Sequence, residues 1–291
     1  MTVLDVLQRS AAYLTERGVE SPRLNAELIV SHVLKKPRLR LYLEFDHAVP
    51  EADLAVAREL VRRRGRREPL QHLTGTTGFL NLNLEVTSEV LVPRPETEVL
   101  AQLAILRLKE IPEDSAPIAL DFGTGSGCLA IALAQAVPNA EIHALDISQP
   151  ALAVARKNAT SNRTERIQFH AGDGFSALAG WVPDLRRRFS LVVTNPPYIP
   201  TSEIATLEPE VRDHDPRIAL DGGPDGLAFY RRLALEAADW LRPGGRLLAE
   251  FGDGQAPALK ELFESSGWKT EAIEKDLSGR DRVLIVRPPT E

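Results

Sequence analysis

The chain has 291 residues, of which 43% are hydrophobic and 26% charged, a balance that fits a globular protein of one or two domains and excludes disordered and membrane-embedded classes. Its formal net charge of −6 is unevenly placed: residues 1–75 carry 13 Lys and Arg against 10 Asp and Glu, whereas the remainder carries 22 against 31, which argues against nucleic acid as a direct partner. No stretch approaches the ~20 apolar residues that span a bilayer and the first residues lack a signal-peptide layout, so we expect a cytoplasmic protein with no membrane contact.

Residues 1–74 are predicted to form a helical domain. Apolar side chains in residues 3–14 recur with helical spacing, and Gly18 is a plausible end of this first helix. Ser21 and Pro22 are typical of a helix start. The apolar face of the helix that follows is expected to contain Leu24, Leu28, Ile29 and Val33.

A third helix should begin near Pro50 and end in the basic run from Arg62 to Arg67. Such a run can bind RNA, but more often it is the solvated last turn of a helix, where positive charge complements the helix dipole. We favour the second interpretation. Small helical bundles placed before an enzyme core commonly recognise a partner, so we expect residues 1–74 to contact the substrate.

Residues 75–92 are predicted to form a β-hairpin that links two domains. Apolar and polar residues alternate over residues 80–86, as in a half-buried strand, and Val90–Val92 can form its return strand. The segment Pro93–Leu100 then starts a helix, because Pro95 suits a first helical turn and the acidic residues beside it suit the positive end of the helix.

From residue 117 onward, short apolar strands and helices alternate. Strands are expected at IALDFG, EIHALD, RIQFHAGD, SLVVT and GRLLAEFG, with two closing strands near Trp268 and Val283. Helices are expected at LAIALAQAV, PALAVARKNA, LAFYRRLALEAADWL and QAPALKELFESSG. This order predicts an α/β fold over residues 93–291, with a mostly parallel sheet and helices on both faces. Ligands of such sheets lie beyond the carboxyl ends of the strands.

A glycine-rich loop follows the first of these strands and comprises Gly123, Thr124, Gly125, Ser126 and Gly127. Glycines let the backbone turn sharply and approach a ligand closely. The pattern is G-x-G-x-G, whereas dinucleotide-binding loops read G-x-G-x-x-G and aim a helix end at a pyrophosphate. The difference fits a sulfonium cofactor, which carries an adenosine, a carboxylate and an amine but no phosphate.

Acidic residues end the next two strands. Asp146 can accept hydrogen bonds from both hydroxyls of a ribose. Asp173 is placed to reach an adenine amine, with Phe175 or its neighbours packing on the ring. Alternatively, both aspartates cap the helices that follow them. Cys128 is interpreted as a small buried residue rather than an activated thiol, and the six histidines show no metal-ligand spacing, so no metal is expected.

Asn195, Pro196, Pro197 and Tyr198 follow the fourth strand at the same edge of the sheet. The two prolines hold a stiff extended turn. Asn195 can accept from an NH2 group while neighbouring carbonyls take the other proton, and Tyr198 can stack on a flat target. An amide nitrogen is a poor nucleophile, so its site must hold it in line with the methyl group. The alternative, a proline-rich exit from a strand, is disfavoured by the nearby glycine loop.

These motifs resemble those of class I S-adenosylmethionine-dependent methyltransferases that act on planar nitrogens. The chain as a whole further resembles the HemK/PrmC family, the glutamine-N5 methyltransferases of class-1 peptide chain release factors. This resemblance covers essentially the full length. Besides NPPY, it rests on REPLQHLTG, LVPRPETE, GGPDGLAFYR and AEFGDGQ.

The resemblance implies a Rossmann-like domain that binds S-adenosylmethionine and methylates the glutamine of the Gly-Gly-Gln motif of release factors. It implies that Asn195 and the carbonyl of Pro196 hold the glutamine amide, while Pro197 and Tyr198 shape its slot. The cofactor would contact Gly123, Thr124, Gly125, Ser126, Gly127, Asp146, Asp173, Gly174, Phe175 and Asn195, with Arg94, Glu96 and Thr97 over its methionine end. Gly174 departs from the family, which often has an aromatic residue there, so the adenine pocket should be more open or filled by Phe175.

Three alternatives remain. A nucleic-acid adenine methyltransferase shares NPPY, but it normally needs a basic recognition surface and a pocket for a flipped base. A ribosomal-protein glutamine methyltransferase usually has PRSP where this chain has PRPETE. A non-catalytic adaptor is disfavoured by the intact GTGSG and NPPY motifs. We therefore expect a release factor as the partner, and a monomer, since no obligate interface is readable.

Overall fold

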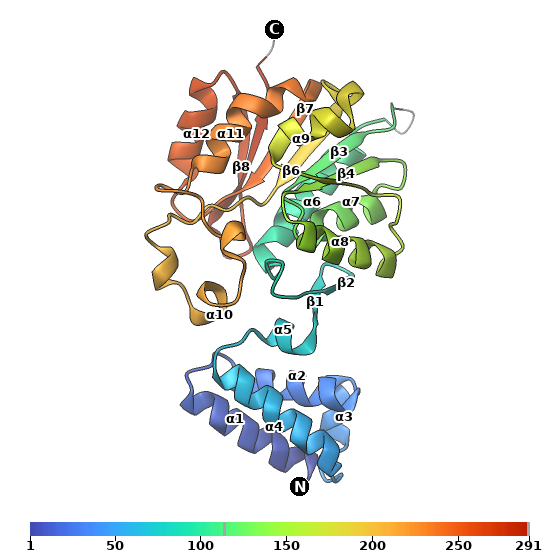
Figure 1. The fold of residues 1–291 in the computed structure, drawn as a ribbon, viewed down its shortest axis with the longest axis vertical. Helices are drawn as coiled ribbons and strands as arrows, with labels where there is room; N and C mark the ends of the chain where they lie inside the picture. The colour runs from blue at the N-terminus through green and yellow to red at the C-terminus, as the bar shows by residue number, and fades with distance from the viewer. Residues whose placement is uncertain (113–114, 290–291) are drawn as a thin grey trace. The chain divides into compact units, whose positions relative to one another are not determined.

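The computed structural model describes residues 1–112 and 115–289, and the chain forms two compact units (Figure 1). The N-terminal unit comprises Met1–Thr76 together with Leu207–His214. The sheet unit comprises Thr77–Thr206 and Asp215–Glu291. Nothing in the sequence predicted that residues 207–214, which follow the NPPY motif, belong to the N-terminal unit.

The N-terminal unit is helical, as predicted. Thr2 and Asp5 form a capping box at its first helix, in which the Thr2 hydroxyl accepts from Asp5 N at 3.2 Å and the Asp5 carboxylate accepts from Thr2 N at 2.9 Å. Apolar side chains from several helices form one buried cluster. The helices are α1 (Val3–Glu16), α2 (Pro22–Leu34), α3 (Arg38–Leu43), α4 (Glu51–Gly65), α5 (Leu70–Thr74) and α10 (Pro209–Arg212).

The buried face of α2 differs from the predicted one. Leu24 is 39% exposed, whereas Asn25 and Glu27 are 8% and 2% exposed. Both buried polar side chains have partners, because Arg64 Nε donates to Asn25 Oδ1 at 2.8 Å and Arg23 Nε donates to Glu27 Oε1 at 2.6 Å. Polar groups with such partners can be buried. The hydrophobic pattern alone therefore misplaced the inward face of this helix.

The basic run at the end of α4 is solvated only in part. Arg64 is 6% exposed and pairs with Glu210 at 2.9 Å. Arg67 pairs with Glu210 and with Glu208, each at 2.7 Å. Carboxylates from residues 207–214 thus neutralise two of these arginines inside the N-terminal unit. The prediction that this helix end is solvated is therefore wrong for Arg64. The same pairs leave less positive charge free to bind RNA phosphates.

Strands β1 (Thr76–Phe79) and β2 (Leu82–Glu85) form a two-stranded sheet. The alternating burial predicted for β2 is confirmed. The return strand predicted at Val90–Val92 is wrong, because these residues are in no strand. The partner of β2 instead precedes it, across a short turn in which Leu80 has a φ of 51°.

A seven-stranded sheet, with the order β5-β4-β3-β6-β7-β9-β8, forms the centre of the sheet unit. Neighbours from β5 to β7 pair in parallel, and β9 pairs antiparallel with β7 and β8, as expected for a mostly parallel sheet. The strands are β3 (Ile118–Phe122), β4 (Glu141–Asp146), β5 (Gln168–Ala171), β6 (Phe189–Thr194), β7 (Leu241–Glu250), β8 (Lys269–Lys275) and β9 (Asp281–Arg287).

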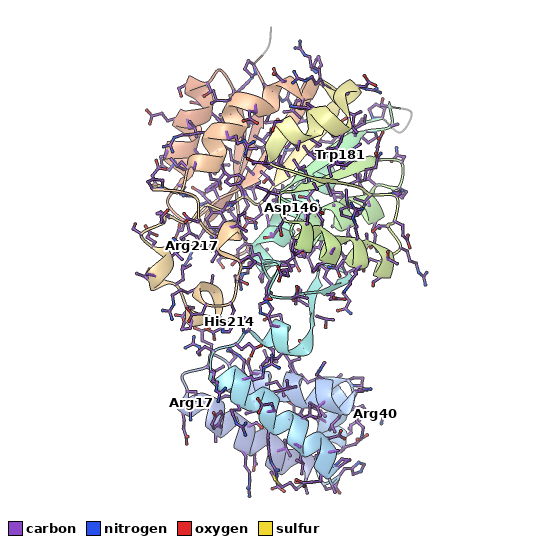
Figure 2. The ribbon with its side chains drawn as sticks, viewed as in Figure 1. Arg17, Arg40, Asp146, Trp181, His214 and Arg217 are labelled. Carbon is purple, nitrogen blue, oxygen red and sulfur yellow. The ribbon has the colours of Figure 1, made fainter. Side chains whose placement is uncertain are left out.

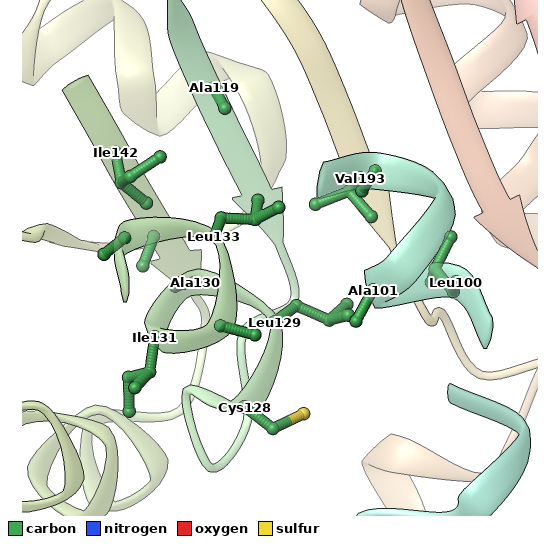
Figure 3. Packing of buried hydrophobic residues seen from close by; sticks show 14 of the residues in the cluster. Leu100, Ala101, Ala119, Cys128, Leu129, Ala130, Ile131, Leu133, Ile142 and Val193 are labelled. Carbon is green, nitrogen blue, oxygen red and sulfur yellow. The ribbon is translucent and has the colours of Figure 1, made fainter. Parts of the chain in front are cut away.

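Helices cover both faces of this sheet. The helices are α6 (Pro95–Lys109), α7 (Cys128–Ala136), α8 (Gln149–Ser161), α9 (Gly174–Trp181), α11 (Ala228–Glu236) and α12 (Ala256–Ser265). One buried cluster joins α6 and α7 to the sheet, and Figure 3 shows their side chains beside Ala119 and Val193. A second cluster joins α9, α11 and α12 to the other face. None of the helices described is long and apolar enough to cross a membrane.

Candidate active site

The strand order reverses between β3 and β6, and ligands of doubly wound sheets bind at such a switch point. A cavity of about 1030 Å³, its open mouth included, lies there. Its lining comes largely from the residues that follow β3, β4, β5 and β6. The predicted site residues that line it are Gly123, Thr124, Gly125, Ser126, Asp146, Asp173, Gly174, Asn195, Pro196 and Pro197. Gly127, Phe175 and Tyr198 are not part of this lining.

The glycine loop owes its conformation to positive φ angles. Gly123, Gly125 and Gly127 have φ values of 75°, 54° and 85°, which side chains rarely adopt. A Cβ at Gly123 or Gly125 would meet no atom within 4 Å, so both positions face open space. A Cβ at Gly127 would lie 3.2 Å from that of Ala155, so Gly127 serves the packing of α7 against α8.

Asp146 is the last residue of β4 (Figure 2). Its side chain bonds to the loops on either side, because Gly125 N donates to its Oδ2 and Ser148 N to its Oδ1, both at 2.8 Å. Burial raises the pKa of Asp146, while these backbone hydrogen bonds lower it. The cap of α8 is Ser148, not Asp146, because the Ser148 hydroxyl accepts from Ala151 N at 3.2 Å. Each carboxylate oxygen of Asp146 keeps a lone pair that can accept from a ligand hydroxyl.

Asp121 is a residue of this site whose role the sequence did not reveal. Its side chain is fully buried, and Oδ2 accepts from Thr124 Oγ1 at 2.6 Å and from Ala130 N at 3.0 Å. Burial raises the pKa of Asp121 to about 7. The carboxyl therefore ties the glycine loop to the first turn of α7. Burial and the nearby Asp121 raise the pKa of Cys128 to about 12, so that thiol stays protonated and inert.

Asp173 follows β5 and stands at the N-cap position of α9, but its carboxylate already has a partner. It pairs with Arg232 of α11 and makes no side-chain cap bond to α9. Gly174 has a φ of 68°, and a Cβ there would overlap the Arg232 guanidinium. Arg232 thus occupies the space into which a side chain at position 174 would project. The sequence held no signal for this contact, because it joins residues 59 positions apart.

Phe175 does not line the cavity, contrary to the expectation that it packs on an adenine ring. It is 2% exposed, and its ring lies 4.8 Å from that of Phe122 and 5.9 Å from that of Trp240. The first turn of α9 directs this side chain into the core between helix and sheet. Phe175 is therefore a core residue, and the adenine side of the cavity is bounded by other residues.

Asn195 follows β6 and is fixed by α6. Its Nδ2 donates to Thr97 Oγ1 at 3.0 Å, and Thr97 is 2% exposed. Arg94 also lines the cavity and pairs with Asp215 at 2.7 Å, whereas Glu96 is not part of the lining. Of the lesser candidates named from the sequence, Thr97 therefore has the most direct contact with the NPPY motif.

Tyr198 is not part of the cavity lining and packs against the core of the sheet unit. A Cβ added to Gly252 would lie 3.0 Å from its ring, and the ring joins the core beneath α11 and α12. Burial raises the pKa of Tyr198 to about 12. Its carbonyl accepts from Gln255 Nε2 at 2.9 Å. The predicted stacking of Tyr198 on a flat target is thus not supported by its position, and it supports the NPPY turn from behind.

Glu250, the last residue of β7, lies behind Asn195 and was missed by the sequence analysis. It is 1% exposed, and Thr194 and Ala249 are in register between β6 and β7, so Asn195 and Glu250 leave the sheet side by side. Burial raises the pKa of Glu250 to about 7, against hydrogen bonds from Thr97 and Asn195 that lower it.

Two family models match the chain. The PrmC N-terminal domain matches residues 5–75, and the methyltransferase small domain matches residues 102–207. Among solved structures, a methyltransferase from Pyrococcus furiosus superposes with a TM-score of 0.52 at 20% identity, covering 79% of this chain and 99% of its own. The hMettl16 catalytic domain, in complex with the MAT2A 3'UTR hairpin 6, has a TM-score of 0.52 at 14% identity, covering 82% of each chain. These structures establish the class I methyltransferase fold.

Curated relatives match over nearly the full length. The release factor glutamine methyltransferase of Geobacter sulfurreducens is 41% identical over 97% of this chain and 95% of its own length. That of Deinococcus radiodurans is 41% identical over 99% of both chains, and that of Streptomyces coelicolor 42% over 94% of both. Identity at this level, along both units, places the cavity and its NPPY turn in a known family: the chain belongs to the release factor glutamine methyltransferases.

Proposed function

We propose that the cavity at the switch point binds S-adenosylmethionine and that Asn195 presents to it the side-chain amide of the glutamine in the Gly-Gly-Gln motif of class-1 release factors. The product is the N5-methylated glutamine. The observation that carries this proposal is the position of Asn195, which lines the cavity with its Nδ2 held by Thr97. That bond leaves the Asn195 oxygen as the acceptor for a substrate amide.

The cavity fits this cofactor. Gly123 and Gly125 leave open space where other residues would have a side chain, so a ligand can approach the backbone. Asp146 keeps acceptor capacity for ribose hydroxyls. Among the described residues, no group of His, Cys, Asp and Glu is arranged to hold a metal ion. The bound cofactor supplies an electrophilic methyl group on a positively charged sulfur.

The substrate amide needs orientation more than proton transfer. Its nitrogen lone pair is delocalised, so the reaction is slow unless the nitrogen is held in line with the methyl carbon. Asn195 Oδ1 can accept one N–H of the amide, and the backbone carbonyl of Pro196 can accept the other. Both residues are fixed by the Pro196-Pro197 turn, and such orientation lowers barriers by roughly 7–11 kcal/mol. Hydrogen bonds to both protons also stabilise the positive charge that develops on nitrogen.

Incubation with labelled S-adenosylmethionine and unmethylated release factor, followed by peptide mass analysis, tests the function. We expect one added methyl group on the glutamine of the Gly-Gly-Gln peptide. Label only in ribosomal protein or only in nucleic acid from the same extract would refute the release-factor assignment and favour the corresponding alternative. No transfer to any of them, with cofactor still bound, would favour an adaptor.

Two variants test the role of Asn195. Asn195→Ala should lower transfer at least about 100-fold, because it removes the acceptor that orients the amide. The dissociation constant of the cofactor, from calorimetry, should change little. Asn83→Ala removes an exposed asparagine side chain on β2 and is the matched control, with transfer expected to stay at the wild-type rate. Equal loss of transfer and of cofactor binding in Asn195→Ala would contradict this role.

The same proposal sets the cellular context. An enzyme that modifies release factors acts where those factors meet the ribosome, so we place it in the cytoplasm. Its substrate is a folded protein rather than a nucleic acid, and a single chain contains every residue assigned to the cavity. We therefore propose that it acts as a monomer. Sedimentation at assay concentrations would test this, and a stable dimer would refute it.

A further inference from the structure

We infer that Glu250 and Thr97 are positioning residues that hold the Asn195 amide in one orientation, with both of its protons turned away from the substrate and its oxygen turned toward it. The inference rests on the proposed function, because it concerns how Asn195 receives the glutamine amide. Neither residue needs to contact the substrate for this role.

The argument starts from the two protons of Asn195 Nδ2. One is donated to Thr97 Oγ1 at 3.0 Å. Glu250 follows Ala249, which is in register with Thr194, so its buried carboxyl lies beside Asn195, and both Thr97 and Asn195 lower its pKa. A hydroxyl that accepts from Asn195 can still donate its own proton, and an ionised carboxylate can only accept. Asn195 thus donates one proton to Thr97. The Thr97 hydroxyl proton and the second Asn195 proton can turn toward the neighbouring Glu250 carboxyl.

An asparagine amide can rotate by half a turn and exchange its oxygen for its nitrogen at little steric cost. In the rotated state it would present an NH2 group to the substrate NH2 group, and two donors do not form a hydrogen bond. The ionised Glu250 disfavours that state, because the rotated Asn195 would turn its oxygen toward the carboxylate. The orientation of the catalytic amide thus depends on an acceptor behind it.

The position of Glu250 favours this role over a purely structural one. It is 1% exposed, and its Oε2 finds no hydrogen-bond partner within residues 1–112 and 115–289. Burying a carboxyl with an unpartnered oxygen is costly, and an apolar side chain at the end of β7 would avoid that cost. Its neighbour Tyr230 donates to the Glu250 backbone carbonyl at 2.6 Å, so the strand end is held without the carboxyl.

The carboxyl is also poised to titrate. Burial raises the pKa of Glu250 to about 7. The charged and titratable groups that act on it come from the elements packed around it: Arg282 of β9, Glu96 of α6, Tyr198, Tyr230 of α11 and Cys128 of α7. Of these, Arg282 lowers the pKa of Glu250 and Glu96 raises it. Protonation converts the acceptor into a donor, so the preferred orientation of Asn195 should weaken as the pH falls through about 7.

Steady-state kinetics of three variants test the inference, with one substrate, release factor or cofactor, held at a saturating concentration while the other is varied. Thr97→Val keeps the shape but removes the hydroxyl, and we expect kcat to fall roughly 100-fold with little change in cofactor affinity. Thr97→Ser restores the hydroxyl and should recover most of the rate. Glu250→Gln should remove the rise in kcat near pH 7 that the wild type shows. Asp121 also has a pKa of about 7, so the midpoint of the rise is compared in Asp121→Asn, whatever its kcat. We expect the rise to persist there, which assigns it to Glu250.

The side-chain NH2 signal of Asn195 in ¹⁵N-labelled protein gives a readout independent of activity. It is identified by its loss in Asn195→Ala, and it should shift with a midpoint near pH 7 in the wild type but not in Glu250→Gln. If Thr97→Val fails to fold, Glu250→Gln and this signal decide the matter. Wild-type transfer to the Gly-Gly-Gln peptide with unaltered kinetics and unaltered Asn195 signals in the variants would overturn this inference alone. Failure of the wild type to methylate that peptide would instead refute the proposed function.

Discussion

Replacing Asp121 by asparagine should stabilise the sheet unit above neutral pH. Asp121 is fully buried, its Oδ2 carries both hydrogen bonds of the side chain, and its Oδ1 has none among the described residues. Asparagine has nearly the same shape. Its oxygen can accept the same two hydrogen bonds, and its NH2 group takes the unpartnered position.

The magnitude follows from linkage. The pKa of Asp121 rises from 3.8 to about 7, a shift of about 3 units, and each unit corresponds to about 1.4 kcal/mol. The folded state binds the proton more tightly, so this carboxyl costs no stability at low pH and a growing amount as the pH rises from about 4 to 7. At pH 8 the cost is about 4 kcal/mol, and at pH 5 it is about 2 kcal/mol. Burying the asparagine NH2 group without a partner reduces the stability gained by about 1–3 kcal/mol. A net gain of about 1–3 kcal/mol at pH 8, and little or none at pH 5, is expected.

Urea unfolding followed by tryptophan fluorescence measures this effect in one unit only. Trp181, Trp240 and Trp268 all lie in the sheet unit. Asp225→Asn is a control of opposite sign: a hydrogen bond from Arg231 lowers the pKa of Asp225 to about 2, so its loss should destabilise the protein above pH 4. If wild type and Asp121→Asn lost stability equally between pH 5 and pH 8, the burial of an ionisable carboxyl beneath the glycine loop would be the wrong explanation.

Three further predictions concern other parts of the molecule. Burial lowers the pKa of His143 and lowers that of His170 to about 4. The stability that these neutral histidines contribute is therefore complete above about pH 6.5 and is lost as the pH falls toward 4. In urea unfolding at several pH values, His170→Gln should reduce this loss of unfolding free energy, and an unchanged dependence on pH would contradict the prediction. Arg64→Met removes one of the two cations paired with the half-buried Glu210 and the donor to the buried Asn25, and it should cost about 2 kcal/mol in the N-terminal unit. Hydrogen exchange of α2 and α4 would measure this, and protection equal to wild type would refute it. Phe175→Leu should cost about 1 kcal/mol of stability and leave cofactor affinity unchanged by calorimetry, whereas a tenfold loss of affinity would restore the ring-stacking role.

Features that depend on neighbours in the chain could be predicted from the sequence. The strands of the sheet unit appear where apolar runs end in polar turns, and the glycine loop lies after β3 because both are encoded within one short stretch. Parallel pairing then brings Asp146 and Asn195 to one edge of the sheet, although they are 49 positions apart in the printed sequence. The α/β class and the cavity location therefore required only local patterns and the rules of parallel sheets.

Features that depend on side-chain direction and on distant partners could not be predicted. Phe175 follows a strand end, but the first turn of α9 decides whether its ring enters the cavity or the core, and the sequence does not fix that rotation. Arg232 reaches Asp173 from another helix, and Glu250 reaches Asn195 from another strand. The inward face of α2 was misplaced for a related reason, since the buried Asn25 oxygen accepts from Arg64, which comes from another helix.

The membership of residues 207–214 in the N-terminal unit has a consequence for how the chain folds during synthesis. Arg67 is synthesised before its partner Glu208, which is 141 positions later in the chain. At about 5–20 residues per second, roughly 7–30 seconds of translation separate them. Helices α1 to α5 thus leave the ribosome long before the carboxylates that neutralise Arg64 and Arg67. Each unit is built from two separate stretches of the chain. A fragment that stops at Thr76 therefore lacks the carboxylates that neutralise Arg64 and Arg67.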